Sequence, residues 1–370
     1  LPHPSRALGP PSAALAVIIV TRHALIGLLA GAFAGAFLIT GGNPLTAGLD
    51  LVNEHLLPSL QSPWKVGAIA FTFILGGFAA ILERGGGLGA LMGRFAGNRR
   101  NLETGAVALG ILCFFDGLAN SMVVGRVSRD LADRAGTARV KLAYIADSTS
   151  SAVACVALVS TWIAFQLSMI ADAYEMAGRT ANPYAVFLES LPYNFYCWFT
   201  LVLLFVAVRR QFHPGPMAKY VREATPTAPE QATINNDAAA SPLSALAPLA
   251  VLMVSFFALF ILLGSTGPIL PLTRDKLVAS FGSDAGPVVL VLAASIAVLA
   301  AMLMFPKRPG GKFKPSSLAF GSGVKTMIGP IFILLAAWMM GSALNELGTA
   351  ALISKLATET SSLALLPALT

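Results

Sequence analysis

The chain has 370 residues, of which 56% are hydrophobic and 12% are charged, and its mean hydropathy is +0.73. A soluble globular protein carries roughly 25% charged residues and needs polar surface toward water, so this composition excludes a soluble fold. The formal net charge of +7 does not indicate a nucleic-acid partner, because the positive residues lie in short stretches between apolar blocks, as in the loops of membrane proteins.

Apolar blocks follow one another along most of the chain, and a membrane-spanning helix needs about 20 mostly apolar residues. We predict spans at 11–40, 66–83, 142–170, 185–208, 243–264, 287–305 and 325–344, with a further apolar run at 349–370. Residues 209–241 are rich in Pro, Ala, Thr and Asn, and are predicted to form a flexible linker between a first membrane half, 1–208, and a second half, 242–370. The predicted fold is an all-α polytopic membrane protein.

The loops between these blocks alternate in charge. Basic residues gather in 84–103, 126–141, 209–222 and 307–314, whereas few lie in 41–65, 171–184 and 265–286. The positive-inside rule predicts that the basic loops, including the linker, are cytoplasmic and that the others are external.

Residues 104–125 are apolar and about one span long, yet a basic loop lies on each side. If this segment crossed the membrane, one of the basic loops would be external. We therefore predict a re-entrant hairpin that enters from the cytoplasmic side and turns near Asp116-Gly117, with an ordinary crossing helix as the alternative. Non-helical backbone at this depth is tolerated only where protein or a water-filled cavity surrounds it.

Asp116 is the first candidate for a transport residue, because an ionisable side chain at membrane depth costs about 2.5–3.5 kcal/mol and marks a pathway. Asn120 and Ser121 follow it with further oxygen atoms. Oxygen ligands of this kind, together with carbonyls freed at a helix break, suit a hard cation such as Na⁺. The alternative is that Asp116 only caps the returning helix.

A second acid, Asp147, opens a polar run inside the apolar span 142–170. The run continues with Ser148, Thr149, Ser150 and Ser151. Because such side chains compete for backbone hydrogen bonds, we predict an unwound segment that binds an ion or a substrate. The alternative is that the hydroxyl groups hold neighbouring helices together.

A carboxylate inside the membrane suggests a mechanism of exchange. Burial disfavours the charged form, so a proton binds when no cation is present, and a cation displaces it by favouring the ionised form. We predict that Asp116, Asn120 and Asp147 bind Na⁺, and that the protein exchanges Na⁺ for H⁺ across the cytoplasmic membrane.

The remaining motifs do not indicate an enzyme. Residues 85–89 are glycine-rich, but they follow an apolar helix and lack the spacing of a dinucleotide site. Gly27, Gly31 and Gly35 are predicted to let two helices approach closely. The four histidines and three cysteines form no ligand cluster in the sequence, and we expect no organic cofactor.

Three stretches resemble the NhaC-type Na⁺/H⁺ antiporter family. They are LGGFAAILERGGGLGAL at 75–91, FFDGLANSMVVG at 114–125 and KLAYIADSTSSAVACVALVSTWIAFQ at 141–166. The resemblance implies an inverted-repeat transporter, in which each repeat brings a re-entrant hairpin and a discontinuous helix to a central site. The family commonly has two acids where this chain has Asp116 and Gly117, which leaves the coupling stoichiometry and the cation open.

Two other functions stay open. Relatives that exchange malate or lactate look similar, so one alternative is an ion-coupled exchanger of small carboxylates, and the other is a membrane subunit that does not transport. The chain starts at Leu1 and stops at Thr370 inside an apolar run, and we expect it to be part of a longer protein in which a second hairpin follows. We expect no nucleic-acid partner, and a homodimer is compatible with the sequence.

Overall fold

Helices account for most of the chain that the computed structural model describes, namely residues 4–223, 241–265, 273, 276, 280, 281, 283–305, 316–349, 351 and 352. These described residues contain no β-strand, which confirms the prediction of an all-α protein. The helices belong to two compact units, Leu1–Val66 with Met327–Thr370, and Gly67–Thr326.

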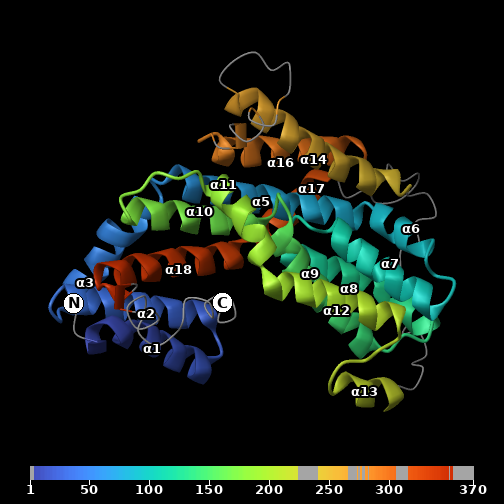
Figure 1. Cartoon of the computed structure of the whole chain (residues 1–370), viewed down its shortest axis with the longest axis horizontal. Helices are drawn as coiled ribbons and strands as arrows, with labels where there is room; N and C mark the ends of the chain where they lie inside the picture. The colour runs from blue at the N-terminus through green and yellow to red at the C-terminus, as the bar shows by residue number, and fades with distance from the viewer. Residues whose placement is uncertain are drawn as a thin grey trace. The chain divides into compact units, whose positions relative to one another are not determined.

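The first unit joins helices from both ends of the chain. α1 (Pro4–Thr21) packs on α2 (Ala24–Ile39), and α18 (Ile328–Glu346) packs on α2 as well (Figure 1). After α2 the chain continues as α3 (Pro44–Asp50), the π-helix η1 (Leu51–Leu56) and α4 (Leu57–Ser59), bent by 112° from α2.

Residues 11–40, predicted as one span, instead form parts of two helices that fold back on each other. Arg22 has a φ of +57° and separates α1 from α2. A Cβ added to Gly31 would lie 2.7 Å from the Cβ of Ala14, so the two helices touch through glycine. Gly27 of the predicted glycine face also lies against α1, whereas a Cβ added to Gly35 would lie 2.9 Å from the Cβ of Ala343 in α18. A straight 30-residue helix would be about 45 Å long, which exceeds the roughly 30 Å hydrocarbon core of a bilayer.

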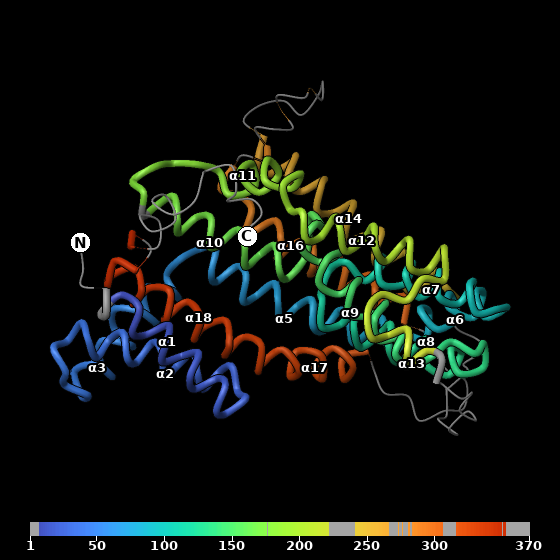
Figure 2. Tube along the Cα trace, turned by 60° about the horizontal axis from the view of Figure 1, so that its bottom comes forward, coloured from blue at the N-terminus to red at the C-terminus, as the bar shows by residue number. Residues whose placement is uncertain are grey.

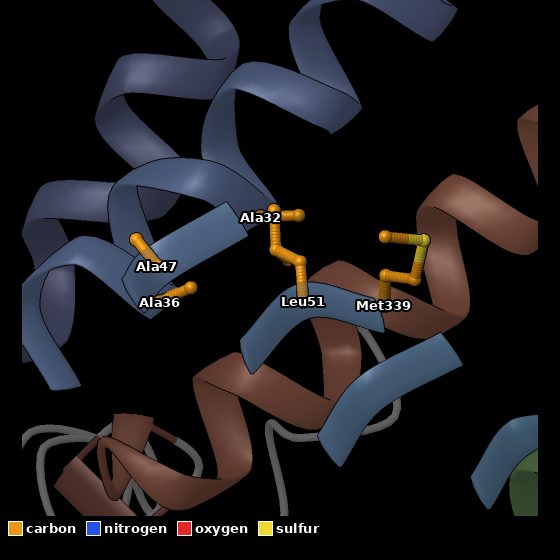
Figure 3. Packing of buried hydrophobic residues seen from close by; sticks show 5 residues of the cluster. All are labelled: Ala32, Ala36, Ala47, Leu51 and Met339. Atoms are coloured by element: carbon orange, nitrogen blue, oxygen red, sulfur yellow. The ribbon is translucent and has the colours of Figure 1, made fainter. Parts of the chain in front are cut away.

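Residues 41–65, predicted as an external loop, are mostly helical. Asn43 accepts a hydrogen bond from the backbone N of Leu45 at 3.0 Å, and Pro44 follows at the first helical position, so a new helix begins immediately after the turn. An apolar cluster then buries one face of this segment against α2 and α18 (Figure 3). The cluster consists of Ala32, Ala36, Ala47, Leu51 and Met339.

The second unit carries the remaining helices, and α5 enters it from the first unit. In chain order they are α5 (Pro63–Arg84), α6 (Gly87–Gly93), α7 (Arg99–Leu112), α8 (Gly117–Arg134), α9 (Arg139–Val156), α10 (Thr161–Met176), α11 (Pro183–Ser190), η2 (Leu191–Tyr193), α12 (Phe195–Arg209), α13 (Met217–Glu223), α14 (Leu243–Gly264), α16 (Gly286–Leu303) and α17 (Ser316–Thr326). α9 contacts α7, α8 and α12, and α14 packs on α16 and also contacts α6 (Figures 1 and 2).

Helix length and composition agree with a multi-pass membrane protein. Four described helices are long and apolar enough to cross a bilayer: Pro63–Arg84, Leu243–Gly264, Gly286–Leu303 and the continuous stretch Ser316–Glu346. The number rises to seven if each of three bent helix pairs counts as one span. The four long helices include the predicted spans 66–83 and 243–264 and most of 287–305 and 325–344, and the predicted spans 142–170 and 185–208 correspond to two of the bent pairs. The third bent pair, Ala24–Ile39 with Pro44–Ser59, includes residues that were predicted to form a loop.

The first part of the predicted linker 209–241 packs against the second unit. Lys141 of α9 donates a hydrogen bond from Nζ to the carbonyl O of Phe212 at 2.9 Å, and Met217 of α13 is buried. Residues 224–240 of the linker lie outside the described residues, as do most of 265–286, 307–314 and 349–370.

Candidate functional site

α7 and α8 form a helical hairpin. The side-chain Nδ2 of Asn120 in α8 donates a hydrogen bond to the carbonyl O of Gly110 in α7 at 2.6 Å. Residues ten apart in a continuous helix lie about 15 Å apart, so the chain must turn back between them. The turn occupies residues 113–116, where the sequence predicts it. Its depth in a membrane stays a prediction.

Asp116 lies at this turn and caps α8. Its backbone is extended, with φ −153° and ψ 125°, and its Oδ1 accepts a hydrogen bond from the backbone N of Ala119 at 2.6 Å. The residue is only 4% exposed. The capping role is therefore real, but it uses one carboxylate oxygen and leaves the other for a second contact.

A second helix break separates α9 from α10, which are bent by 43° relative to each other. The break covers residues 157–160. Ser160 stabilises both sides of it, because its Oγ donates to the carbonyl O of Ala154 at 2.6 Å and accepts from the backbone N of Ile163 at 3.1 Å. A single buried hydroxyl thus closes the end of α9 and caps the start of α10.

The two breaks meet at the carboxylate of Asp116. Thr161, the first residue of α10, donates a hydrogen bond from Oγ1 to Asp116 Oδ2 at 2.9 Å, and its backbone N donates to the carbonyl O of Phe115 at 3.0 Å. The N-termini of α8 and α10 therefore lie together, and their partial positive charge favours an anion there. Within the described residues no ion pair includes Asp116, so its negative charge has no fixed counter-ion.

Asn120, one turn further along α8, connects the hairpin to α9. Its Oδ1 lies 3.2 Å from Oγ1 of Thr149, which is also 2.9 Å from the carbonyl O of Ile145. Asn120 and Thr149 are fully buried. A Cβ on Gly110 would lie 2.4 Å from Thr149 Oγ1, so the close approach of α7 to α9 depends on this glycine.

The predicted unwinding of residues 147–151 is wrong, because all five residues are part of α9. The hydroxyl groups find acceptors within their own helix: Oγ of Ser150 and of Ser151 donate to the carbonyl O of Asp147 at 2.9 and 3.3 Å. Side chains that bond back to the preceding turn do not require the helix to open. The helix breaks later, at residues 157–160.

The predicted site residues differ in their surroundings. Asp116, Asn120 and Thr149 are buried, and Asn120 contacts Thr149 whereas Asp116 contacts Thr161; Ser148 and Ser150 are also buried. Ser121 and Ser151 are half-buried, whereas Asp147 is exposed. The structure therefore places Asp147 outside the buried group around Asp116, in contrast to the predicted Na⁺ site that includes both acids.

The sequence prediction missed Ser160 and Thr161 as parts of this site. Ser160 could have been recognised, because a serine directly before a renewed apolar run is typical of a helix N-cap. No local pattern indicated that Thr161 would contact a residue 45 positions earlier.

Gly117 brings α8 into close contact with the backbone of α9. A Cβ at this position would lie 2.8 Å from the carbonyl O of Ser150 and 2.8 Å from Nε1 of Trp162. This is the position at which the resemblance leads us to expect a second acid. In this chain the neighbouring backbone occupies the space that such a side chain would need.

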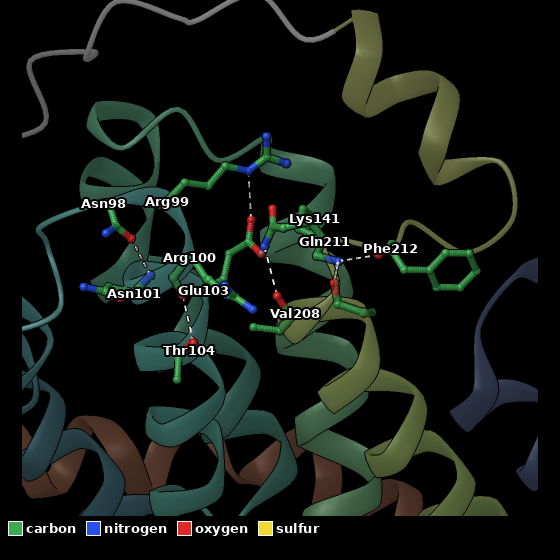
Figure 4. Close-up of polar contacts among 11 residues, drawn as sticks. Asn98, Arg99, Arg100, Asn101, Glu103, Thr104, Lys141, Val208, Gln211 and Phe212 are labelled. Atoms are coloured by element: carbon green, nitrogen blue, oxygen red, sulfur yellow. Dashed lines mark hydrogen bonds and ion pairs between the residues drawn. The ribbon is translucent and has the colours of Figure 1, made fainter.

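A buried polar cluster joins α7, α9 and α12 at their predicted cytoplasmic ends (Figure 4). Glu103 is 1% exposed and accepts hydrogen bonds from Arg99 Nε at 3.1 Å and Gln211 Nε2 at 2.8 Å. Lys141, fully buried, donates from Nζ to the carbonyl O of Phe212. These contacts hold together the two helices, α7 and α9, that supply the buried group around Asp116.

His213 lies beside this cluster, and burial together with the charges of Lys141 and Arg99 lowers its pKa, against an opposing effect of Glu103. As the pH falls through about 6.5, the ordinary pKa of histidine, the unfolded chain takes up a proton at His213 before the folded protein does. Acid therefore favours the unfolded chain and destabilises the folded protein. We expect His213→Gln to remove this effect. We measure the thermal unfolding temperature of both proteins in detergent. The difference, variant minus unchanged protein, should increase as the pH falls from 7.5 to 5. A constant difference across this range would contradict the assignment.

Comparison with known proteins supports a relationship to cation exchangers. The sequence model of the Na⁺/H⁺ antiporter family matches residues 153–370, which is more than half of the chain and includes Ser160 and Thr161 but not Asp116. An uncharacterized protein of Haemophilus influenzae is 23% identical over 356 residues, which cover 93% of this chain and 67% of that protein. No solved structure matches the chain. The family match extends over most of the second unit and into the first, and the chain belongs to the Na⁺/H⁺ antiporter family.

Proposed function

We propose that this protein exchanges Na⁺ for H⁺ across the cytoplasmic membrane, and that Asp116 is the group for which the two ions compete. The supporting observation is that Asp116 is 4% exposed and that, among the described residues, no ion pair compensates its charge. A buried carboxylate without a counter-ion is strongly unfavourable. It is therefore occupied either by a proton or by a cation, and the arrival of one requires the departure of the other.

Neutral oxygen atoms near Asp116 would complete the coordination of a desolvated Na⁺. Thr161 Oγ1 touches the carboxylate, Asn120 brings an amide oxygen one turn further along α8, and Thr149 of α9 brings a hydroxyl oxygen beside Asn120. Oxygen ligands at helix breaks are a common way for transporters to bind Na⁺. The two helix N-termini act in the opposite direction, because they stabilise the free carboxylate and so help the proton to leave.

The remaining predicted residues would act around this centre. Asp147 is exposed on α9, and we assign it the role of attracting cations toward the site rather than exchanging protons. The hydroxyl groups on the neighbouring turns supply further ligands as the ion moves: Ser121, Ser148, Ser150 and Ser151. The basic stretch that begins the linker, 209–222, would face the cytoplasm.

Everted membrane vesicles that contain the protein as its gene encodes it provide the test. We expect Na⁺ to collapse a preset pH gradient in these vesicles and not in vesicles without the protein. A collapse that requires malate or lactate and ignores Na⁺ would contradict the proposal in favour of carboxylate exchange. No response to either solute, with the protein shown to be present, would indicate a subunit that does not transport.

Thr161→Val tests the contact that joins the two helix breaks. Valine keeps the shape but removes the hydrogen bond to Asp116 Oδ2. A hydrogen bond to a charged group contributes about 1.5–3 kcal/mol, and one pH unit corresponds to about 1.4 kcal/mol. Without this donor the carboxylate holds its proton more tightly, so half-maximal exchange should move to higher pH by about one to two units. Thr161→Ser, which retains the hydroxyl group, should restore the profile, and an unchanged profile in Thr161→Val would exclude this role.

A further inference from the structure

One face of α12 is apolar and exposed, and no step of the proposed exchange uses it. The other face packs into the second unit, where the buried residues are Cys197, Leu204, Ala207 and Val208. The exposed apolar side chains are Phe199, Val202, Leu203, Phe205 and Val206. Residues three or four positions apart lie on the same side of an α-helix, so these five side chains form a continuous apolar stripe. In a membrane protein such a surface faces the acyl chains of lipids.

The apolar stripe leads to two exposed arginines at the end of α12. Arg209 follows Phe205 by four residues, and Arg210 follows Val206 by four, so each arginine continues one row of the stripe. At 1.5 Å per residue, the helix rises about 15 Å from Phe199 to Arg209. One leaflet contributes about half of the roughly 30 Å hydrocarbon core of a bilayer. A phospholipid whose acyl chains lie along the stripe therefore has its phosphate beside the arginines.

Two cationic side chains hold the backbone at this end of α12 (Figure 4). Arg100 of α7 donates a hydrogen bond from Nη2 to the carbonyl O of Arg209. Lys141 of α9 donates from Nζ to the carbonyl O of Ala207 at 3.1 Å and to that of Phe212 at 2.9 Å. The last carbonyl groups of a helix carry partial negative charge, which repels an anion, and these two cations offset it. The contacts also fix the backbone that presents the two arginines.

The charge at this helix end is positive. Because Arg100 contacts the carbonyl O of Arg209, three guanidinium groups gather there. Within the described part of the chain, no ion pair includes Arg100, Arg209 or Arg210. Glu103, the acid of the neighbouring polar cluster, is buried and already paired with another cation. Guanidinium groups match the geometry of phosphate and bind it through two parallel hydrogen bonds.

Aromatic side chains follow the arginines in the chain. Phe212 and Tyr220 are both about half exposed, and the ring of Phe212 points away from the polar cluster (Figure 4). Lys219, next to Tyr220 in α13, is exposed as well. Aromatic rings of membrane proteins are enriched at the level of the lipid headgroups. The composition of this segment therefore agrees with a position at the membrane surface.

We propose that the exposed face of α12, from Phe199 to Arg210, binds an anionic phospholipid together with Arg100. The acyl chains lie on the apolar stripe, and the phosphate binds the three guanidinium groups. An anionic lipid is preferred because a zwitterionic headgroup has no net charge for the basic residues to attract. This site is separate from Asp116 and does not depend on the proposed exchange.

Thermal unfolding of the full-length protein in a neutral detergent, measured against the concentration of added lipid, tests this proposal. The two probes are phosphatidylglycerol and phosphatidylcholine with identical acyl chains. We expect phosphatidylglycerol to reach half of its stabilising effect at a concentration at least about tenfold lower than phosphatidylcholine. Equal concentrations for the two lipids, or no effect of either, would overturn the proposal. Inorganic phosphate that stabilises the protein as much as phosphatidylglycerol would also overturn it, because the site would then bind a free anion.

Two pairs of substitutions assign the preference to the end of α12. Arg209→Gln with Arg210→Gln should reduce the ratio between the two lipid concentrations to about twofold or less. Arg84→Gln with Arg94→Gln is the matched control, because it removes two exposed positive charges at the ends of α5 and α6 and should keep the ratio. A ratio stays informative if a variant is less stable in both lipids. A ratio that survives the loss of Arg209 and Arg210, or that falls equally in the control, would overturn the assignment. The measurement needs no transport, so its outcome is separate from that of the vesicle assay.

Discussion

Asp116→Asn should reduce Na⁺-dependent proton exchange to the level of vesicles without the protein. Asparagine cannot take up or release a proton and carries no charge for a cation, so neither half of the exchange is possible. The fold should persist, because asparagine caps helices about as well as aspartate and its amide oxygen can still accept from Ala119 N or Thr161 Oγ1. The measurement is the Na⁺-induced collapse of a pH gradient, with the amount of protein in the membrane and its thermal stability determined in parallel.

Asp147→Asn is the matched comparison, because it makes the same chemical change at an exposed position of α9. If Asp147 only attracts cations, the Na⁺ concentration for half-maximal exchange should rise roughly threefold to tenfold while the maximal rate stays the same. Exchange that survives Asp116→Asn and disappears in Asp147→Asn would reverse the two roles. Loss of the maximal rate in both variants would require both acids to exchange protons.

Gly117→Ala should destabilise the protein and impair exchange together. The added Cβ would lie 2.8 Å from the backbone carbonyl O of Ser150, which cannot move without displacing α9. Excess volume in a tightly packed contact typically costs about 1–3 kcal/mol. Any shift of α8 that relieves the clash also moves the adjacent Asp116 away from Thr161. Thermal unfolding in detergent and exchange in vesicles report the two effects.

Gly125→Ala serves as the control on the same helix, because a Cβ at that position has no atom within 4 Å. Alanine favours a helix over glycine by about 1 kcal/mol, so this variant should be at least as stable as the unchanged protein and should exchange normally. A similar loss in both variants would indicate that α8 tolerates no alanine, and the specific contact at Gly117 would lose its support.

Several features of the candidate site could be predicted because they follow from local sequence. The hairpin turn at residues 113–116 follows from the position of an apolar stretch between two basic loops. The N-cap role of Asp116 follows from the preference of short acceptor side chains for helix starts. The limits of α14 equal the predicted span 243–264, because a long apolar block without internal charged residues favours one continuous helix.

Other features could not be predicted because the same residues are compatible with more than one local structure. Five polar residues at 147–151 suggested a break, but their hydroxyl groups bond to carbonyls of the preceding turn and the helix continues. The break at 157–160 arises where Ser160 can close both helix ends. Residues 41–65 were predicted to be a loop, yet Asn43 starts a helix and an apolar cluster covers it.

By itself the sequence determined that this chain is a helical multi-pass membrane protein with an acid at a turn. A bilayer requires long apolar helices, and an ionisable residue inside an apolar segment is rare and therefore easy to identify in the sequence. Only the tertiary structure decided which residues surround that acid. Thr161 meets Asp116 from 45 positions away, and Ser342 meets His55 from 287 positions away. Such contacts depend on how helices pack, and no periodicity or local preference within one helix encodes the partner on another.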